Sequence, residues 1–294
     1  MKLNRLTNLD RLPARYRPEL LSYFLKKTMG LYPGGTEPDI NEYYRTLINS
    51  NGRYITESGT DFLSAFQFNN KRFAASLRKW PTSDFNVFKE IFETEMYKPL
   101  IDLILKHSPD KASGRKLTVL DAGANVGFFT IYFNLYFPGS ETVAVEPDLK
   151  NCFYINKNIS DNPGINASVL QGGLWKSDSF LQIKTDYRDG LEWSYRVEET
   201  DKDTGLKGYT IKTILHRKNW STLDVLKMDI EGSEKAVFGE RHATLEFLSK
   251  TRFVAIEIHD ELADRAAINS LLEETGFEFF DDSYNTFGVN RKLL

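Results

Sequence analysis

Cysteine is nearly absent from this sequence of 294 residues, in which Cys152 is the one thiol. A single cysteine excludes a disulfide within the chain and a zinc site built from several thiolates. We interpret Cys152 as a small, half-buried apolar residue. This sparing use of cysteine is typical of a reducing compartment, so the sequence predicts a cytoplasmic protein.

Long apolar runs are also missing. No stretch reaches the roughly 20 apolar residues that a membrane-spanning helix requires, so we expect no membrane span. The first 20 residues carry several arginines but no apolar segment, which argues against a secretory signal. A transit peptide is opposed by Asp10, by Glu19 and by the lack of serine enrichment.

Charge of one sign is not concentrated anywhere as a dense stripe of lysine and arginine, so nucleic-acid binding is not expected. The net charge of -3 is nevertheless uneven, because residues 1–80 contain 13 Lys+Arg and 7 Asp+Glu, which leaves the acidic excess to the remainder. The basic start either binds an anionic substrate or forms an ordinary solvated surface. The apolar fraction of 41% is typical of a folded globular protein.

Residues 1–84 are predicted to form a helical N-terminal cap or substrate region. Apolar residues recur at helical spacing in segments 17–30 and 38–49, and phenylalanines repeat through 61–80. A further helical segment is predicted from residue 84 to 108. The many aromatic residues indicate that this region packs on a larger domain, which we place at residues 85–294.

The hydrophobic pattern of the sequence changes at residue 116, where short apolar runs begin to alternate with helical patterns. Buried strands are predicted at 116–123, 142–148, 167–175, 223–230 and 253–260. Helices are predicted at 126–137 and 149–160. Segments 180–185 and 208–215 are interpreted as two further strands, with a polar loop between them that is either a surface excursion or a lid. The sequence therefore predicts an α/β fold of Rossmann-like type.

A glycine-containing loop joins the first of these strands to its helix. It consists of Asp121, Ala122, Gly123, Ala124, Asn125, Val126 and Gly127. Gly123 lets the backbone turn and approach a ligand closely, and the N–H groups at the start of the helix are free to bind polar groups. A dinucleotide site favours a second glycine where Asn125 stands. An acid before the turn and a G-x-x-x-G spacing instead resemble the first motif of methyltransferases that use S-adenosylmethionine (SAM).

A carboxylate at the end of the second strand strengthens this interpretation. Glu146 lies 19 residues after Gly127 and is followed by Pro147, which restrains the chain. A carboxylate there can accept hydrogen bonds from both hydroxyls of a ribose, although a solvated loop acid is the alternative. After the third strand, Gly173 and Leu174 are expected to pass the adenine ring, with Gln171 or Trp175 beside it.

Acidic residues also follow the fourth and fifth strands. Asp229 and Glu231 end one strand, and Glu257 and His259 end the next on one side of the chain. Carboxylates at such an edge are costly unless they meet donors, a cation or a substrate. We expect these four residues to form the catalytic group.

At this point the sequence resembles the FkbM family of SAM-dependent methyltransferases. The resemblance rests on VLDAGANVGFFT, AVEPD followed by NKNIS, LDVLKMDIEGSE and AIEIHD, and it covers about residues 85–294. It implies a seven-stranded, mostly parallel sheet with an antiparallel last strand. It also implies O-methylation of a hydroxyl on a small-molecule or sugar-containing acceptor. Tyr97 matches a place where related enzymes lay a residue over the cofactor, with helix packing as the alternative.

His259 is the residue that we predict to be the base, because the ordinary pKa of histidine is near neutral, with a structural histidine hydrogen-bonded at the strand end as the alternative. Asp229 would orient the cofactor or the acceptor. A divalent cation on Asp229, Glu257 and His259 is an alternative, but we assign no metal. Two rival functions remain, an NAD(P)-dependent oxidoreductase and a non-catalytic binding module. The oligomeric state is open, with a homo-oligomer as one option.

Overall fold

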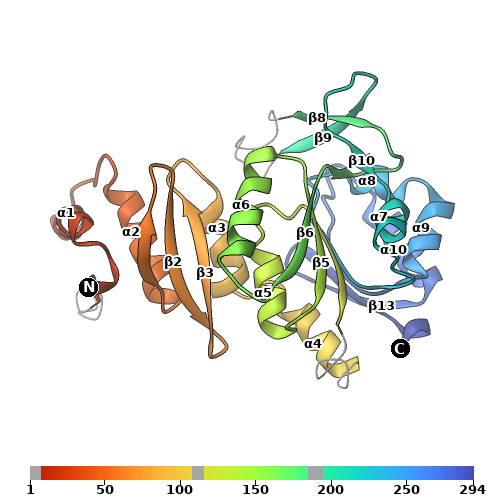
Figure 1. Cartoon of the computed structure of the whole chain (residues 1–294), viewed down its shortest axis with the longest axis horizontal. Coiled ribbons are helices and arrows are strands. Elements are labelled where there is room, and N and C mark those ends of the chain that lie inside the picture. The colour runs from red at the N-terminus through yellow and green to blue at the C-terminus, as the bar shows by residue number, and fades with distance from the viewer. Residues whose placement is uncertain (1–7, 108–115, 185–194) are drawn as a thin grey trace. The chain divides into compact units, whose positions relative to one another are not determined.

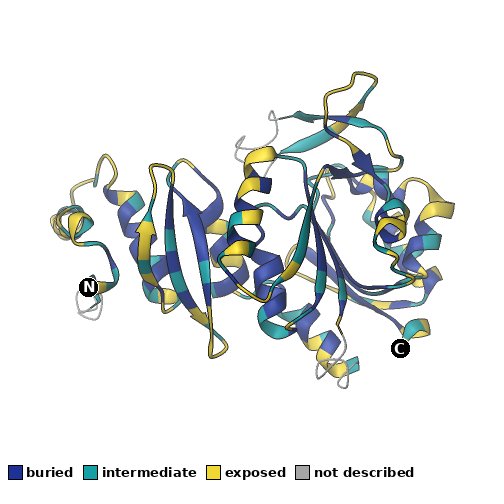
Figure 2. Cartoon of the chain, in the orientation of Figure 1, coloured by how far each residue is buried: buried dark blue, intermediate teal, exposed yellow. Residues whose placement is uncertain are grey.

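The structure is a computed structural model that describes residues 8–107, 116–184 and 195–294. By packing, the chain divides into two compact units, Met1–Glu95 and Met96–Leu294. Figure 1 traces the elements of both units, and Figure 2 shows how far each residue is buried. Among the described helices, none is both long and apolar enough to cross a bilayer.

The unit Met1–Glu95 combines helices with an antiparallel sheet of three strands in the order β1-β2-β3. The strands are β1 (Arg53–Glu57), β2 (Asp61–Phe68) and β3 (Lys71–Arg78). The helical segments are η2 (Leu9–Arg11), η3 (Ala14–Tyr16), α1 (Arg17–Thr28), α2 (Glu37–Asn49), α3 (Asp84–Phe88) and η4 (Lys89–Glu93). Helices therefore make up only part of this region.

The helix expected over residues 61–80 is wrong, because this segment forms the hairpin of β2 and β3. Phe66 lies opposite Phe73 in the register of the two strands. Residues four apart share a face in a strand as well as in a helix, so the spacing of the phenylalanines did not discriminate. The turn residues Asn69 and Asn70 do distinguish a hairpin from a helix, since both adopt positive φ (47° and 58°), as tight hairpin turns require.

Aromatic rings fill the core of this unit. The ring of Tyr43 in α2 stacks on Phe62 with centroids 4.1 Å apart. The ring of Phe92 stacks on Phe73 at 4.5 Å. Stacked and tilted rings of this kind bury large apolar areas. The helical pattern that was expected without a break over 84–108 is interrupted, because α4 (Lys98–His107) starts a new helix in the second unit.

The unit Met96–Leu294 is organised around a sheet of seven strands in the order β13-β14-β12-β11-β4-β5-β6. The strands are β4 (Thr118–Ala122), β5 (Glu141–Glu146), β6 (Asn166–Gln171), β11 (Leu223–Met228), β12 (Thr251–Glu257), β13 (Phe277–Asp282) and β14 (Asn285–Asn290). The last strand, β14, is antiparallel to both of its neighbours, and the other pairings are parallel. The seven-stranded, mostly parallel Rossmann-like sheet is confirmed.

Helices cover both faces of this sheet (Figure 1). Alternate strand residues such as Leu120, Val145 and Leu226 form one apolar cluster with α7 (Ile211–Lys218), α8 (Glu234–Phe238), α9 (Arg241–Leu248) and α10 (Arg265–Thr275). On the opposite face, Ala144 packs against Ile155. That face carries α4, α5 (Phe128–Tyr136) and α6 (Leu149–Ser160). The last element in the sequence is the short helix η7 (Arg291–Leu293). The strands are buried because both of their faces are covered.

In the described residues of this unit, four short strands lie outside the main sheet. β7 (Gly173–Leu174) pairs in parallel with β10 (Gly208–Tyr209), and β8 (Phe180–Lys184) pairs with β9 (Arg196–Thr200). The strand expected over 208–215 is wrong beyond β10, because α7 begins there. The Thr210 hydroxyl accepts a hydrogen bond from Thr213 N at 3.0 Å and so caps that helix. The polar loop predicted over residues 186–208 is wrong at Arg196–Thr200, which form β9, and its residues 186–194 lie outside the described residues.

Candidate functional site

The loop after β4 is forced into its shape by close backbone packing. Gly123, Asn125 and Gly127 all have positive φ, at 74°, 50° and 83°. A Cβ on Gly123 would lie only 1.7 Å from the carbonyl oxygen of Asp229. Only glycine fits there, because the clash is with a backbone atom that cannot move away. The loops after β4 and β11 are thereby held against each other.

Asp121 at the end of β4 is completely buried beneath this loop. Its carboxylate accepts a hydrogen bond of 2.7 Å from the hydroxyl of Thr130 in α5. Burial raises the pKa of Asp121, while Lys227 and the hydrogen bond from Thr130 oppose that rise. With a side chain that has no exposed surface, Asp121 is placed to support the loop.

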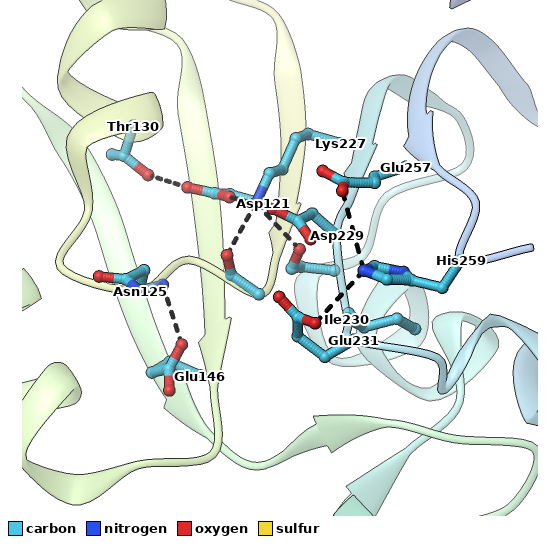
Figure 3. A network of polar contacts seen from close by, with 12 residues as sticks. Asp121, Asn125, Thr130, Glu146, Lys227, Asp229, Ile230, Glu231, Glu257 and His259 are labelled. Carbon is cyan, nitrogen blue, oxygen red and sulfur yellow. Dashed lines mark hydrogen bonds and ion pairs between the residues drawn. The ribbon is translucent and has the colours of Figure 1, made fainter. Parts of the chain in front are cut away.

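Lys227 in β11 is a functional candidate that the sequence interpretation missed. Its Nζ donates hydrogen bonds to the carbonyl oxygens of Gly123 (2.7 Å) and Ala122 (3.3 Å). It also lies 3.5 Å from Asp121 Oδ1 and 3.9 Å from Asp229 Oδ2. Figure 3 shows this amine between the ends of two strands. A lysine inside the apolar run LDVLKM was the available signal, since a buried charge must be paired.

Glu146 at the end of β5 reaches the glycine loop, a contact that the sequence did not predict. Its Oε2 accepts a hydrogen bond of 2.9 Å from the backbone N–H of Asn125 (Figure 3). Its Oε1 accepts from the backbone N–H of Asp148 at 3.0 Å and from the side chain of Asn151 at 3.2 Å. Burial raises the pKa of Glu146 to about 7 in spite of these donors. Pro147, which follows it, is half-buried.

Other residues of the predicted cofactor set are packed inside the fold. Ala124 is buried against the face that carries α6. Leu174 belongs to the main apolar cluster, and Gly173 beside it is also buried. The ring of Tyr97 meets Phe129 of α5 edge-on, with centroids 4.8 Å apart. For Leu174 and Tyr97, packing explains the burial without a ligand.

The two residues proposed beside the adenine ring differ in their exposure and in their contacts. Gln171 is exposed at the end of β6. Trp175 is half-buried, and its indole N–H donates to Glu199 Oε2 at 3.1 Å.

Acids and a histidine from two strand ends meet at the same edge of the sheet. His259 Nε2 lies 3.3 Å from Glu231 Oε2 and 3.8 Å from Glu257 Oε1 (Figure 3). His259 Nδ1 makes a 3.1 Å hydrogen bond with Glu234 Oε1. One ligand atom each from Asp229, Glu231 and His259 falls within 4.8 Å of the others. The four predicted catalytic residues are therefore brought together. We call Asp229, Glu231, Glu257 and His259 the acidic cluster.

The acidic cluster changes the ionisation that we expected for its members. Burial opposes the charge on His259, but the nearby carboxylates of Glu231 and Glu234 outweigh it and raise the pKa of His259 to about 11. Burial and the charge of Asp229 raise the pKa of Glu257 to about 8, although His259 opposes that shift. The near-neutral pKa assumed for His259 is therefore not what this environment produces, because the surrounding carboxylates favour the imidazolium.

Comparison with known proteins agrees with this arrangement. The sequence profile described as "Methyltransferase FkbM domain" matches residues 121–279, which is more than half of the chain. The chain belongs to the FkbM methyltransferase family. The matched range of this family begins at Asp121 and includes Glu146, Asp229 and His259. The family resemblance predicted from the sequence is thus confirmed.

Three curated proteins with sequences similar to this chain are methyltransferases. Methyltransferase 1 of Beauveria bassiana (strain ARSEF 2860) is 25% identical, with 54% of this chain and 71% of the relative covered. Methyltransferase sdnD of Sordaria araneosa is 26% identical, with 56% and 74% covered. The 31-O-demethyl-FK506 methyltransferase FkbM of Streptomyces tacrolimicus is 24% identical, with 65% and 80% covered. This FkbM-family chain is therefore similar to known methyltransferases over more than half of its length.

Solved structures that resemble the chain are more distant. A crystal structure of monomeric WbdD matches with a TM-score of 0.40 and 16% identity, covering 65% of this chain and 40% of WbdD. The chain thus spans less than half the length of that protein. The METTL16 methyltransferase domain matches with a TM-score of 0.40 and 13% identity, covering 69% of this chain and 67% of that domain. Likeness at this level says nothing about the substrate.

Proposed function

We propose that this FkbM-family protein transfers the methyl group of SAM to a hydroxyl oxygen of a small-molecule or glycan acceptor. The observation that carries the proposal is the hydrogen bond between Asn125 N and Glu146 Oε2, at 2.9 Å. It joins the ends of β4 and β5, which lie beside the ends of β11 and β12 that hold the acidic cluster. The name of the relative from Streptomyces tacrolimicus, an O-demethyl-FK506 methyltransferase, favours oxygen as the atom methylated.

The donor end of the site consists of the glycine loop and Glu146, and its chemistry fits SAM. Gly123 lets the loop pack directly against the Asp229 carbonyl, which fixes the loop backbone that would line the cofactor site. A carboxylate has about four acceptor positions, and Glu146 uses three of them within the protein. The acceptor position left on Oε2 is available to a ribose hydroxyl. Asp121 and Lys227 are positioning residues here, because they act on the loop from beneath it.

The acceptor end is the acidic cluster, which we propose orients the acceptor hydroxyl and receives its proton. When bound, SAM supplies a methyl carbon on a sulfonium; the new C–O bond forms as the C–S bond breaks, and S-adenosylhomocysteine leaves. The carboxylates of the cluster hold the hydroxyl in line with that carbon, roughly 3 Å away. Proton removal by a positioned carboxylate contributes about 10²–10⁴ in rate.

Binding and transfer are tested separately. Calorimetry with SAM, S-adenosylhomocysteine and NAD should give binding of the first two and none of NAD. A screen of hydroxyl compounds with SAM labelled in its methyl group should then give a labelled product whose new methyl signal in NMR is a methoxy. Binding of NAD alone would favour an oxidoreductase, and tight SAM binding without transfer to any acceptor would favour a non-catalytic module.

Glu146 and Glu141 form a matched pair for this test, because they lie at opposite ends of β5. Glu146→Gln should weaken SAM binding by about 10- to 100-fold, since a hydrogen bond to a charged group is worth about 1.5–3 kcal/mol. Glu141 contacts Lys218 and Trp220 at the other edge of the sheet, so Glu141→Gln should leave binding unchanged. Equal effects of the two substitutions would contradict the ribose role of Glu146.

A further inference from the structure

The acidic cluster holds donor atoms at distances that suit a metal ion. His259 Nε2 and Glu231 Oε2 are 3.3 Å apart, and the ligand atoms of Asp229, Glu231 and His259 all lie within 4.8 Å of one another. Ligands about 2.1 Å from one ion are about 3 Å apart when adjacent and about 4.2 Å apart when opposite. Small rotations of the side chains would therefore bring all three atoms onto a common centre.

His259 supplies an observation that is independent of the acids. The residue is only 3% exposed, and its Nε2 has no hydrogen-bond partner among the described residues. Its other nitrogen, Nδ1, is engaged by Glu234, which also accepts a hydrogen bond from the backbone N–H of Ile230 at 3.3 Å. A histidine that binds a metal through one nitrogen commonly donates its other N–H to a carboxylate in this way. Glu234 thus directs Nε2, as an acceptor, into the acidic cluster.

The backbone around Glu231 is arranged to aim its carboxylate at His259. Glu231 has a φ of 52° and Gly232 has a φ of 90°. A Cβ on Gly232 would lie 2.3 Å from Leu262 Cδ1, so the two loops interlock at this point. Leu262 is tied to His259 by a backbone hydrogen bond of 2.8 Å. A non-glycine residue held at positive φ is typical of functional sites, where packing maintains an unfavourable conformation.

Several carboxylates lie close together around one imidazole. Glu231, Glu234 and Glu257 each have a carboxylate oxygen between 3.1 and 3.8 Å from a ring nitrogen of His259. Lys227 lies 3.9 Å from Asp229 and already donates to the Gly123 carbonyl. Several carboxylates facing one another are stable when a cation lies among them.

We propose that Asp229, Glu231 and His259 bind one divalent metal ion. The donor set of two carboxylates and one imidazole suits Mn²⁺ or Mg²⁺, which favour oxygen-rich sites. Our sequence interpretation assigned no metal and named Glu257 where the structure points to Glu231. Glu257 lies next to the site, with its Oε1 3.8 Å from His259 Nε2. The competing arrangement of the same atoms is an imidazolium ion-paired with Glu231, with no metal.

For the reaction, this site deepens the proposed function and rests on it. A divalent ion there would bind the acceptor oxygen and make its proton easier to lose. The proton would then pass to Glu257. Metal binding itself needs neither SAM nor acceptor, so a failure to bind metal and a failure to transfer methyl groups are separate results.

The experiment titrates Mn²⁺ into the full chain after treatment with a chelator, without SAM. The bound ion is counted by the loss of the free Mn²⁺ signal in electron paramagnetic resonance. We expect one Mn²⁺ per chain, and a dissociation constant at least tenfold weaker in Asp229→Asn and in His259→Ala. Added Mg²⁺ should compete for the same site.

Matched controls are His242→Ala and Glu240→Gln, because both residues are exposed on the same unit. These two variants should bind Mn²⁺ like the unaltered chain. Asp229→Asn changes no volume, so it remains a valid test if removal of the buried His259 impairs folding. Absence of binding at millimolar Mn²⁺, or equal binding by Asp229→Asn and the controls, would overturn the metal site and favour the imidazolium.

Discussion

The donor end and the acceptor end of this site are built in different ways. At the donor end, the glycine loop is held by backbone packing, and Glu146 meets three N–H donors. At the acceptor end, the side chains of the acidic cluster face one another across two loops. The donor end is therefore complete without a ligand, whereas the acceptor end is stabilised by a proton or a cation. Under the proposed function, SAM binding depends on the packed scaffold and the acceptor chemistry depends on a few side chains.

The largest effect expected at the donor end comes from Gly123→Ala. The new Cβ meets the Asp229 carbonyl oxygen at 1.7 Å and the φ of 74° disfavours any side chain, so we expect destabilisation of about 4 kcal/mol and loss of SAM binding. Urea denaturation and calorimetry measure the two effects.

Gly139→Ala is the matched control for that substitution. Gly139 also has a positive φ, of 80°, but a Cβ there would meet nothing within 4 Å. Gly139→Ala should therefore lower the free energy of unfolding by only about 1 kcal/mol and leave SAM binding unchanged. If the two variants behave alike, close packing of the two loops is not what shapes the donor end.

The next effect tests whether Lys227 joins the two ends. Lys227→Met removes the donor to the Gly123 carbonyl and leaves the buried Asp121 without its cation, so we expect a loss of about 3 kcal/mol in the free energy of unfolding. The double variant with Asp121→Asn should recover part of that loss, because no buried charge then remains. Urea denaturation of the single and double variants measures this coupling.

Lys212→Met provides the comparison for Lys227→Met. Lys212 pairs with Glu246 at the surface, where its side chain is largely exposed. Its removal should change stability by less than about 1 kcal/mol. A similar small change in Lys227→Met would show that the buried amine does not hold the strand ends together.

The smallest effect concerns the pH dependence of the donor end. Burial raises the pKa of Glu146 to about 7, above its ordinary value, so the folded protein binds a proton there that the unfolded chain releases. The stability due to this proton is present at pH below about 4.5 and is lost as the pH rises through 7. Relative to Glu146→Gln, the unaltered chain should therefore lose stability between pH 5 and pH 8.

Ligand binding should change in the opposite direction, because a ribose diol donates hydrogen bonds to the ionised carboxylate. The affinity for 5′-methylthioadenosine, which lacks the titrating amino acid portion of SAM, should rise about tenfold from pH 6 to pH 8. Glu146→Gln should show no such rise in calorimetry. A flat profile in the unaltered chain would separate Glu146 from the ribose.

Prediction from the sequence succeeded best where local patterns repeat. The runs that became β4, β5, β11 and β12 are apolar, short and followed by polar residues at the sheet edge, so strand type and loop position were both predictable. The segment 61–80 was mistaken for a helix because a spacing of four fits both structures. Segment 208–215 was predicted to be a strand, but the helix α7 begins within it behind the Thr210 cap.

The candidate site, like the fold, was predictable from the sequence only in part. Gly123, Glu146, Asp229 and His259 stand at strand ends in the sequence, and their meeting follows from a parallel sheet. The roles of Lys227 and Glu234 did not follow, since each depends on a partner more than 20 residues away in sequence. The ionisation of His259 was also beyond the sequence, because acids of the segment 229–234, which follows a different strand, set it.

By itself, the sequence determined that the chain forms a parallel α/β sheet with a glycine loop and a following acid, and that it resembles FkbM methyltransferases. These properties are encoded locally, in the order of apolar runs and the residues that end them. The tertiary structure decided which carboxylates meet His259, that Asp121 is buried on Lys227, and that residues 61–78 pair as strands. These three features depend on contacts between segments that are distant in the sequence. No local pattern specifies how close such segments lie or how deeply they are buried.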